Sequence, residues 1–320
     1  MEEENRQAED GDLQDGLVDE EESLRLAEKM LAEDENLRQQ DEDIVHTTAT
    51  LRIKLGDSYM RRGNASRAIG EYKRAVKMEG NNAAFLTRLA DAYLYLDKVS
   101  EAITHYRHAI NADANCSEAR ISLGDLYQNF SMFREALAQY RAAVEIHPTR
   151  AYYHFKLGNL LLMMNKFHEA LGEMRITVSL APADAYYRFR LGVALTRMDM
   201  KEEALQEFYK ASTLAPYDDY YLIRAATAQL ACGKPLEAIA LIRKAIEIVP
   251  ENRAYLALLA DALTVAGMKP QAATLLRYLG QLDGYDLEFL LRRRSEWGQD
   301  GEPSPSLSLP FSGEDLQNSN

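Results

Sequence analysis

The chain has 320 residues, 47% of them apolar, so it can bury a sizeable core. No apolar run approaches the ~20 residues that a membrane-spanning helix needs, which predicts no membrane span. The acidic stretch Met1–Glu4 resembles neither a secretory signal nor an Arg-rich transit peptide, so we expect a cytoplasmic protein. The net charge of −13 is uneven: residues 1–48 carry −14 (18 acids, 4 bases), residues 298–320 carry −4, and the rest carries +5 (33 bases, 28 acids).

The N-terminal segment, residues 1–48, has no repeated pattern. Its first part is acidic and polar, which predicts disorder. From about residue 20 to residue 40, Leu24, Ala27 and Leu31 recur at helical spacing. This spacing predicts an amphipathic helix there.

A 34-residue pattern dominates the following part of the chain. One copy begins at Ala185 and contains Leu191, Gly192, Ala204 and Phe208. The same residue types recur at corresponding positions 34 residues before and after it. A fixed period of this length predicts a solenoid, in which each copy buries its apolar face against its neighbours. Seven copies follow one another without insertion: 49–82, 83–116, 117–150, 151–184, 185–218, 219–252 and 253–286.

The residue pattern of each copy predicts two helices. Positions within a copy are numbered from 1 to 34. Positions 8, 20 and 27 are mostly small, so two backbones can approach, and positions 7, 11 and 24 are mostly large and apolar. Glycine or asparagine, as at Gly63, Asn165 and Gly233, marks the turn between the helices. Proline begins or follows several second helices, because it is tolerated at a helix start and cannot continue a helix. These prolines are Pro148, Pro182, Pro216, Pro235, Pro250 and Pro270.

The pattern resembles the tetratricopeptide repeat family over about three quarters of the chain. The resemblance implies an all-α fold, a right-handed superhelical solenoid of tandem helix-turn-helix repeats, whose concave groove binds peptides or partner helices. The seventh copy departs from the pattern, since Leu279 is followed by Gly280 and no proline ends it. Atypical terminal repeats often cap a stack. We expect a capping helix over residues 285–297 and a disordered tail over 298–320.

Positions 2, 6, 9 and 13 of the first helix lie opposite its packed face, and in the family this side lines the groove. In the first three repeats position 9 is Asp57, Asp91 and Asp125, which roughly balance Lys54, Arg88 and Arg61. The next three repeats instead combine tyrosine with a base. The resulting partner-binding set is Tyr152, Phe155, Lys156, Asn159, Tyr186, Phe189, Arg190, Arg197, Tyr220 and Arg224.

Two interpretations of this set remain open. Tyrosine and arginine are enriched at interface hot spots, and the bases would select a protein or peptide with acidic and apolar character. Alternatively, each tyrosine shields a helix end and the base packs on its ring. The tyrosines at position 3 face partly toward the core and are predicted to be structural. They are Tyr153, Tyr187, Tyr221 and Tyr255.

Other functions find little support in the residues. Some family members bind chaperone C-termini through a two-carboxylate clamp that needs lysine at position 5, and here that position holds no lysine. No metal-binding, phosphate-binding or nucleophile motif has a recognisable context, so we expect no enzyme activity, metal, cofactor or small-molecule substrate. The sequence pI of about 5.1 argues against nucleic acid.

The sequence therefore predicts a scaffold or adaptor that captures a peptide or protein. The alternative is a regulatory or assembly-factor subunit of a larger enzyme or secretion complex. The acidic N-terminal arm either competes with a ligand for the basic face or only keeps the protein soluble. Cys116 and Cys232 lie more than three repeats apart, too far for a disulfide, which predicts free thiols.

Overall fold

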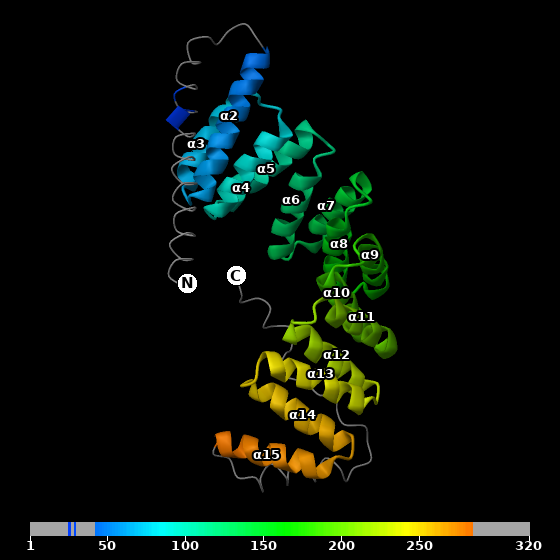
Figure 1. Cartoon of the computed structure of the whole chain (residues 1–320). Coiled ribbons are helices and arrows are strands. Elements are labelled where there is room, and N and C mark those ends of the chain that lie inside the picture. Colours follow the sequence, from blue (N-terminus) through cyan, green and yellow to red (C-terminus); the bar gives the residue numbers. More distant parts are fainter. Residues whose placement is uncertain (1–24, 27–28, 30–41, 284–320) are drawn as a thin grey trace. The chain divides into compact units, whose positions relative to one another are not determined.

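The computed structural model describes residues 25–26, 29 and 42–283, shown as coloured ribbon in Figure 1. This part of the chain contains fourteen helices, α2 to α15, and no strand. The helix predicted over residues 20–40 falls mostly outside the described residues, although residues 25, 26 and 29 are helical. The predicted capping helix 285–297 and tail 298–320 also lie outside them.

The chain divides into two units, residues 1–181 and 182–320. The helices of the first unit are α2 (Glu42–Arg61), α3 (Ala65–Met78), α4 (Ala83–Tyr95), α5 (Val99–Ala112), α6 (Ser117–Asn129), α7 (Phe133–Ile146), α8 (Ala151–Met163) and α9 (Phe167–Leu180). Those of the second unit are α10 (Ala185–Arg197), α11 (Lys201–Leu214), α12 (Asp219–Ala231), α13 (Pro235–Ile248), α14 (Arg253–Val265) and α15 (Lys269–Asp283).

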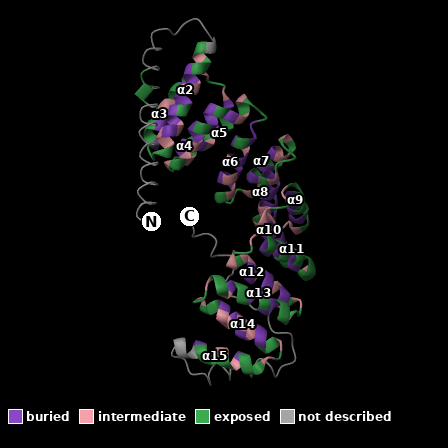
Figure 2. Ribbon diagram, in the orientation of Figure 1, coloured by how far each residue is buried: buried purple, intermediate pink, exposed green. Residues whose placement is uncertain are grey.

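Both units are built from tandem helix pairs. In the first unit α2 packs on α3, α4 on α5, α6 on α7 and α8 on α9, and the second helix of each pair packs on the first helix of the next. The second unit repeats this arrangement from α10 to α15. Figure 2 shows the resulting burial, with buried stripes along helices whose other sides are exposed. Each helix is thus amphipathic, as the periodicity predicts.

Helix boundaries follow from local residues. Asn82, Asp184 and Asp218 each accept a hydrogen bond from a backbone N–H in the first turn of the following helix. These side chains satisfy N–H groups that a helix start leaves without partners. In the turns within the pairs, Gly63 and Asn165 have positive φ values of 73° and 58°. At the N-terminal end the helix is longer than the pattern indicates, since α2 begins at Glu42 and the first repeat was expected from Ala49.

Small residues at position 8 allow the helices of a pair to approach closely. A Cβ atom added to Gly56 would lie 2.3 Å from Cε1 of Tyr72, and one added to Gly124 would lie 2.5 Å from Cε1 of Tyr140. Both tyrosines are buried, at position 24 of their repeats. The predicted pairing of small and large residues between these positions is therefore confirmed.

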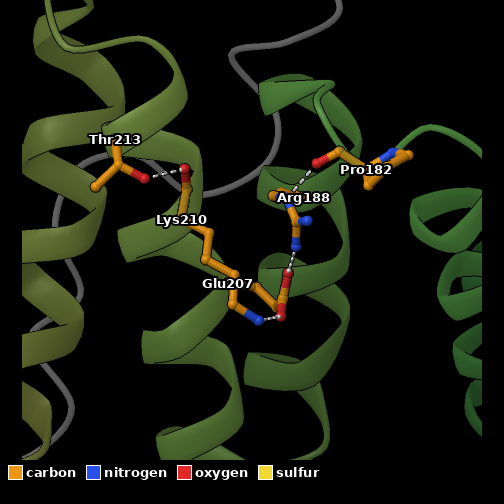
Figure 3. A network of polar contacts seen from close by, with 5 residues as sticks. All are labelled: Pro182, Arg188, Glu207, Lys210 and Thr213. Carbon is orange, nitrogen blue, oxygen red and sulfur yellow. Dashed lines mark hydrogen bonds and ion pairs between the residues drawn. The ribbon is translucent and has the colours of Figure 1, made fainter.

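Positions 4 and 23 form a buried polar connection in several repeats. In α10 the guanidinium of Arg188 donates from Nη1 to Glu207 Oε2 (3.0 Å) and from Nε to the carbonyl of Pro182 (2.8 Å), as Figure 3 shows. Lys210 also donates to Glu207, at 2.7 Å. Arg188 thereby fastens the start of α10 both to α11 and to the loop before it. Arg52 and Glu71 make the corresponding pair in the first repeat, at 2.9 Å.

Gln229 breaks the apolar pattern at position 11, where other repeats have large apolar residues. It is buried, and its side-chain carbonyl oxygen has no hydrogen-bond partner among the described residues. A buried polar atom without a partner costs ~1–3 kcal/mol. We therefore expect Gln229→Leu to raise the free energy of unfolding by ~1 kcal/mol, measured by urea denaturation. Gln206→Leu, at an exposed position of α11, is the matched control, and an equal gain in both variants would contradict the argument.

Candidate functional site

Helices α8, α10 and α12 each begin with two tyrosines in succession, of which the first is exposed. Tyr152, Tyr186 and Tyr220 are 43%, 43% and 41% exposed. At position 3, in contrast, Tyr153 is buried and its hydroxyl lies 3.0 Å from Ser117 Oγ, one repeat earlier. Tyr255 donates in the same way to Asp219, at 2.5 Å. These two residues of the position-3 series join successive repeats, whereas the position-2 tyrosines face solvent.

In the first unit, α8 carries four residues of the predicted set. Lys156 lies over the ring of Tyr152 (5.3 Å to its centroid), and its Nζ donates to Asp125 Oδ2 at 2.9 Å. Burial lowers the pKa of Lys156, but the bond and the charge of Asp125 outweigh that effect, and the net shift is upward. Lys156 thus forms an ion pair with a carboxylate of the preceding repeat, which the sequence of α8 alone does not indicate. Asn159 is half-buried on the same helix.

Phe155 and Phe189 require a correction. Both were expected at the edge of the exposed face, but both are buried, at 8% and 6% exposure. The ring of Phe189 packs against Phe208 and Tyr221, at centroid distances of 5.7 and 5.5 Å, and makes an edge contact of 5.2 Å with Tyr220. Position 5 faces the neighbouring helices in these repeats, so these rings support the surface from below.

The second unit combines tyrosine with three guanidinium groups. Arg190 donates to the hydroxyl of Tyr186 at 3.1 Å, and its guanidinium lies 5.7 Å from the centroid of the same ring. Arg224 lies over the rings of Phe208 and Phe189, at 5.3 and 6.0 Å. Arg197, seven residues after Arg190, is exposed in the last turn of α10. We call Tyr186, Arg190, Arg197, Tyr220 and Arg224 the tyrosine–arginine face.

Charge compensation on this face is incomplete. Arg197 and Arg224 make no ion pair with a carboxylate in the described part of the chain, and Nε of Arg224 is buried without a hydrogen-bond acceptor there. Rings beneath a guanidinium hold its plane in place without satisfying its charge. The face therefore presents preoriented donors that match carboxylate oxygens.

The first three repeats contain a second polar arrangement, which sequence reasoning missed. The hydroxyls of Tyr72 and Tyr106 donate to Asp57 and Asp91, at 2.6 and 2.5 Å, and Tyr140 donates to Asp125. We call these three bonds the tyrosine–aspartate rungs. Aspartate at position 9 and tyrosine at position 24 occur together in these repeats, and both are replaced in the next three repeats; the seventh has Asp261 at position 9 but Leu276 at position 24. This co-occurrence in the sequence could have predicted the tyrosine–aspartate bonds. The prediction from the sequence instead pairs the aspartates only with nearby lysine and arginine residues.

The rungs are partly screened from water. Burial, and then the charge of the paired aspartate, raises the pKa of Tyr106 and Tyr140, and burial also raises the pKa of Asp91. Beside them lies a cleft of about 350 Å³ that is lined by Arg61 and Arg88 among other residues. Arg88 approaches Asp57 to 3.9 Å, as its proposed balancing role implies.

The repeated helix pair matches a known family of repeats. The model described as tetratricopeptide repeat matches residues 53–116, 87–151 and 155–219, which together make up half of the chain. The chain belongs to the tetratricopeptide repeat family. Its predicted fold class, an all-α solenoid of helix-turn-helix repeats, is thereby confirmed, and members of the family are generally interaction scaffolds.

Solved tetratricopeptide structures share this fold at low sequence identity. The C-terminal part of a repeat-containing protein from Cytophaga hutchinsonii is 20% identical, with a TM-score of 0.61, over 73% of this chain and 96% of that one. YrrB, described as having an unusual peptide-binding site, is 22% identical with a TM-score of 0.50, over 58% and 95%. PilW, a type IV pilus biogenesis factor, is 17% identical with a TM-score of 0.55, over 66% and 98%. No curated protein matches the chain.

None of the described tetratricopeptide helices is long and apolar enough to cross a membrane. No group of three or more His, Cys, Asp or Glu side chains among the described residues is placed to hold a metal ion.

Proposed function

We propose that this tetratricopeptide array is a non-enzymatic scaffold that captures a peptide or protein through the tyrosine–arginine face of its second unit. The observation that carries the proposal is the combination of exposed Tyr186 and Tyr220 with Arg197 and Arg224, which lack a carboxylate partner among the described residues. Tyrosine and arginine bury much area in an interface while still forming hydrogen bonds. A ligand that supplies carboxylates and apolar side chains would satisfy both features.

The proposal favours a polypeptide ligand over other ligand classes. Exposed tyrosine rings and guanidinium groups occur on the same face, which suits a chain that carries both apolar and acidic side chains. Acidic composition still argues against nucleic acid. We further propose a cytoplasmic location, which the free thiols of Cys116 and Cys232 support, as predicted from their separation.

The test is selection of random dodecapeptides displayed on phage, followed by binding measurements with the enriched peptides. We expect enriched sequences to contain Asp or Glu beside apolar residues. The double variant Tyr186→Ala/Arg190→Ala should bind them at least ~2 kcal/mol more weakly, a loss of roughly thirtyfold. Circular dichroism should show unchanged helicity, because neither side chain is buried. Binding should also weaken as salt increases.

The matched control is Tyr209→Ala/Arg243→Ala. These residues are exposed on the second helices α11 and α13 of the same unit, away from the tyrosine–arginine face. Affinity should stay within twofold of wild type. Equal losses in both double variants, or enrichment of basic peptides, would refute the proposed site.

A further inference from the structure

The fourth repeat has a histidine where other repeats connect their helices through arginine. His154, at position 4 on α8, is 5% exposed. Its Nδ1 lies 2.6 Å from Glu173 Oε2 on α9, and its Nε2 lies 2.9 Å from the carbonyl oxygen of Pro148 in the preceding loop. The ring therefore connects α8 to α9 and to the loop before α8.

Both ring nitrogens of His154 face hydrogen-bond acceptors. A backbone carbonyl only accepts, and an ionised carboxylate only accepts. A neutral imidazole carries one N–H, so it can donate to Glu173 or to Pro148 but not to both. Its other nitrogen would then direct a lone pair at an oxygen within 3 Å. While Glu173 is ionised, only the imidazolium, with two N–H groups, satisfies this geometry.

Three other repeats have a permanent cation, arginine, at the position of His154. Arg188 donates to Glu207 and to the carbonyl of Pro182 in the same arrangement, which can be followed in Figure 3. Arg120 likewise donates to the carbonyl of Ala114 and to Gln139. Arginine is effectively always charged in proteins, whereas histidine changes its charge within the physiological pH range.

We propose that His154 makes the packing of α8 on α9 pH-sensitive. While the ring holds both protons, it donates hydrogen bonds that connect α8 to α9 and to the loop before α8. When one proton leaves, one of the two hydrogen bonds is lost and a lone pair faces an oxygen. The stabilisation is therefore present at acidic pH and is lost as pH rises. The α10–α11 pair, fastened by Arg188, keeps its connection over the same range.

The charged neighbours of His154 agree with this assignment. Helix α9 contributes the carboxylate of Glu173. The loop before α8 contributes Arg150, which lies over Tyr153, and the exposed His147, whose ring is 6.2 Å from Tyr153. On α8 itself, Lys156 is bound to Asp125 of α6. Glu173 is thus the acid in contact with the ring.

The experiment is hydrogen exchange of the full chain at pH 5.5 and pH 8.5, with rates corrected for intrinsic chemistry. In wild type, we expect amides of α8 and α9 to exchange about tenfold faster at pH 8.5 than at pH 5.5, the scale of one lost charge-assisted bond. Amides of α10 and α11 are the internal control and should change little. In His154→Arg the α8 and α9 amides should lose this pH dependence.

Two further variants complete the test. His154→Gln, which is neutral throughout, should show fast exchange in α8 and α9 at both pH values, and it tests the idea even if the arginine variant does not fold. His147→Asn should retain the wild-type pH dependence, because its ring makes neither bond. Equal pH dependence in wild type, His154→Arg and His154→Gln would overturn the proposal.

Discussion

Replacing Gly124 with leucine is expected to lower the free energy of unfolding by ~3 kcal/mol. A Cβ atom alone would lie 2.5 Å from Cε1 and 2.7 Å from Cδ1 of Tyr140, so the ring must move. Movement would also disturb the bond from its hydroxyl to Asp125. Overpacking a filled core typically costs ~1–3 kcal/mol, and here the loss of a partly buried hydrogen bond adds to it. Denaturant unfolding followed by circular dichroism measures the change.

Gly70→Leu is the matched control for that substitution. Gly70 lies within α3, is exposed, and has no atom within 4 Å of an added Cβ. Since leucine favours helix by ~0.5–1 kcal/mol over glycine, this variant should be as stable as wild type or slightly more stable. Alanine at position 124 is a milder change, because the second repeat already has Ala90 there. A Gly124→Leu protein as stable as the control would show that Tyr140 can move without cost.

The second large effect is expected at the Arg188–Glu207 pair. Both side chains are mostly buried, at 16% and 13% exposure, and Arg188 also holds the carbonyl of Pro182. Arg188→Leu leaves Glu207 with Lys210 as its one cationic partner among the described residues, and it should cost ~3 kcal/mol, measured by the same unfolding experiment. The exposed pair Arg141–Glu169 provides the comparison, and Arg141→Leu should cost less than ~1 kcal/mol.

The double variant Arg188→Leu/Glu207→Leu distinguishes an unpaired charge from lost packing. The sixth repeat has Leu222 and Leu241 at these two positions, and both are buried. Replacing a buried ion pair by well-packed apolar residues is often neutral or stabilising. We therefore expect the double variant to regain most of the stability that Arg188→Leu loses. If the double variant stays as unstable as Arg188→Leu, the loss comes from packing and from the bond to the Pro182 carbonyl, and not from an unpaired charge on Glu207.

The 34-residue period predicted the fold because the contacts between helices recur with the same period as the residues that make them. The alternation of small and large residues fixed which helices pair, and the structure places Gly56 against Tyr72 as that alternation implies. The N-terminal extension of α2 to Glu42 escaped prediction, since it precedes the first copy of the pattern. A repeat template says nothing about residues that precede it.

The candidate site was predicted less completely. Exposed Tyr186 and Tyr220 lie where the helical wheel placed them, but Phe189 is buried beneath them. A wheel resolves directions around one helix and cannot show how closely the next helix approaches. Lys156 illustrates the same limit, because its partner Asp125 belongs to the preceding repeat.

The aspartates of the tyrosine–aspartate rungs also determine how charge is paired when the array gains or loses a repeat. In the first unit, position 6 of one repeat meets position 9 of the repeat before it, as Lys156 meets Asp125 and Arg88 approaches Asp57. Excising residues 117–150 would preserve the period and give Asp91 the ammonium of Lys156. Excising residues 83–116 would instead leave Asp57 facing Ser122, the pairing of positions that Asp91 already has in the intact chain. Copies of equal length therefore preserve the period but differ in the charge that they bring to a new junction.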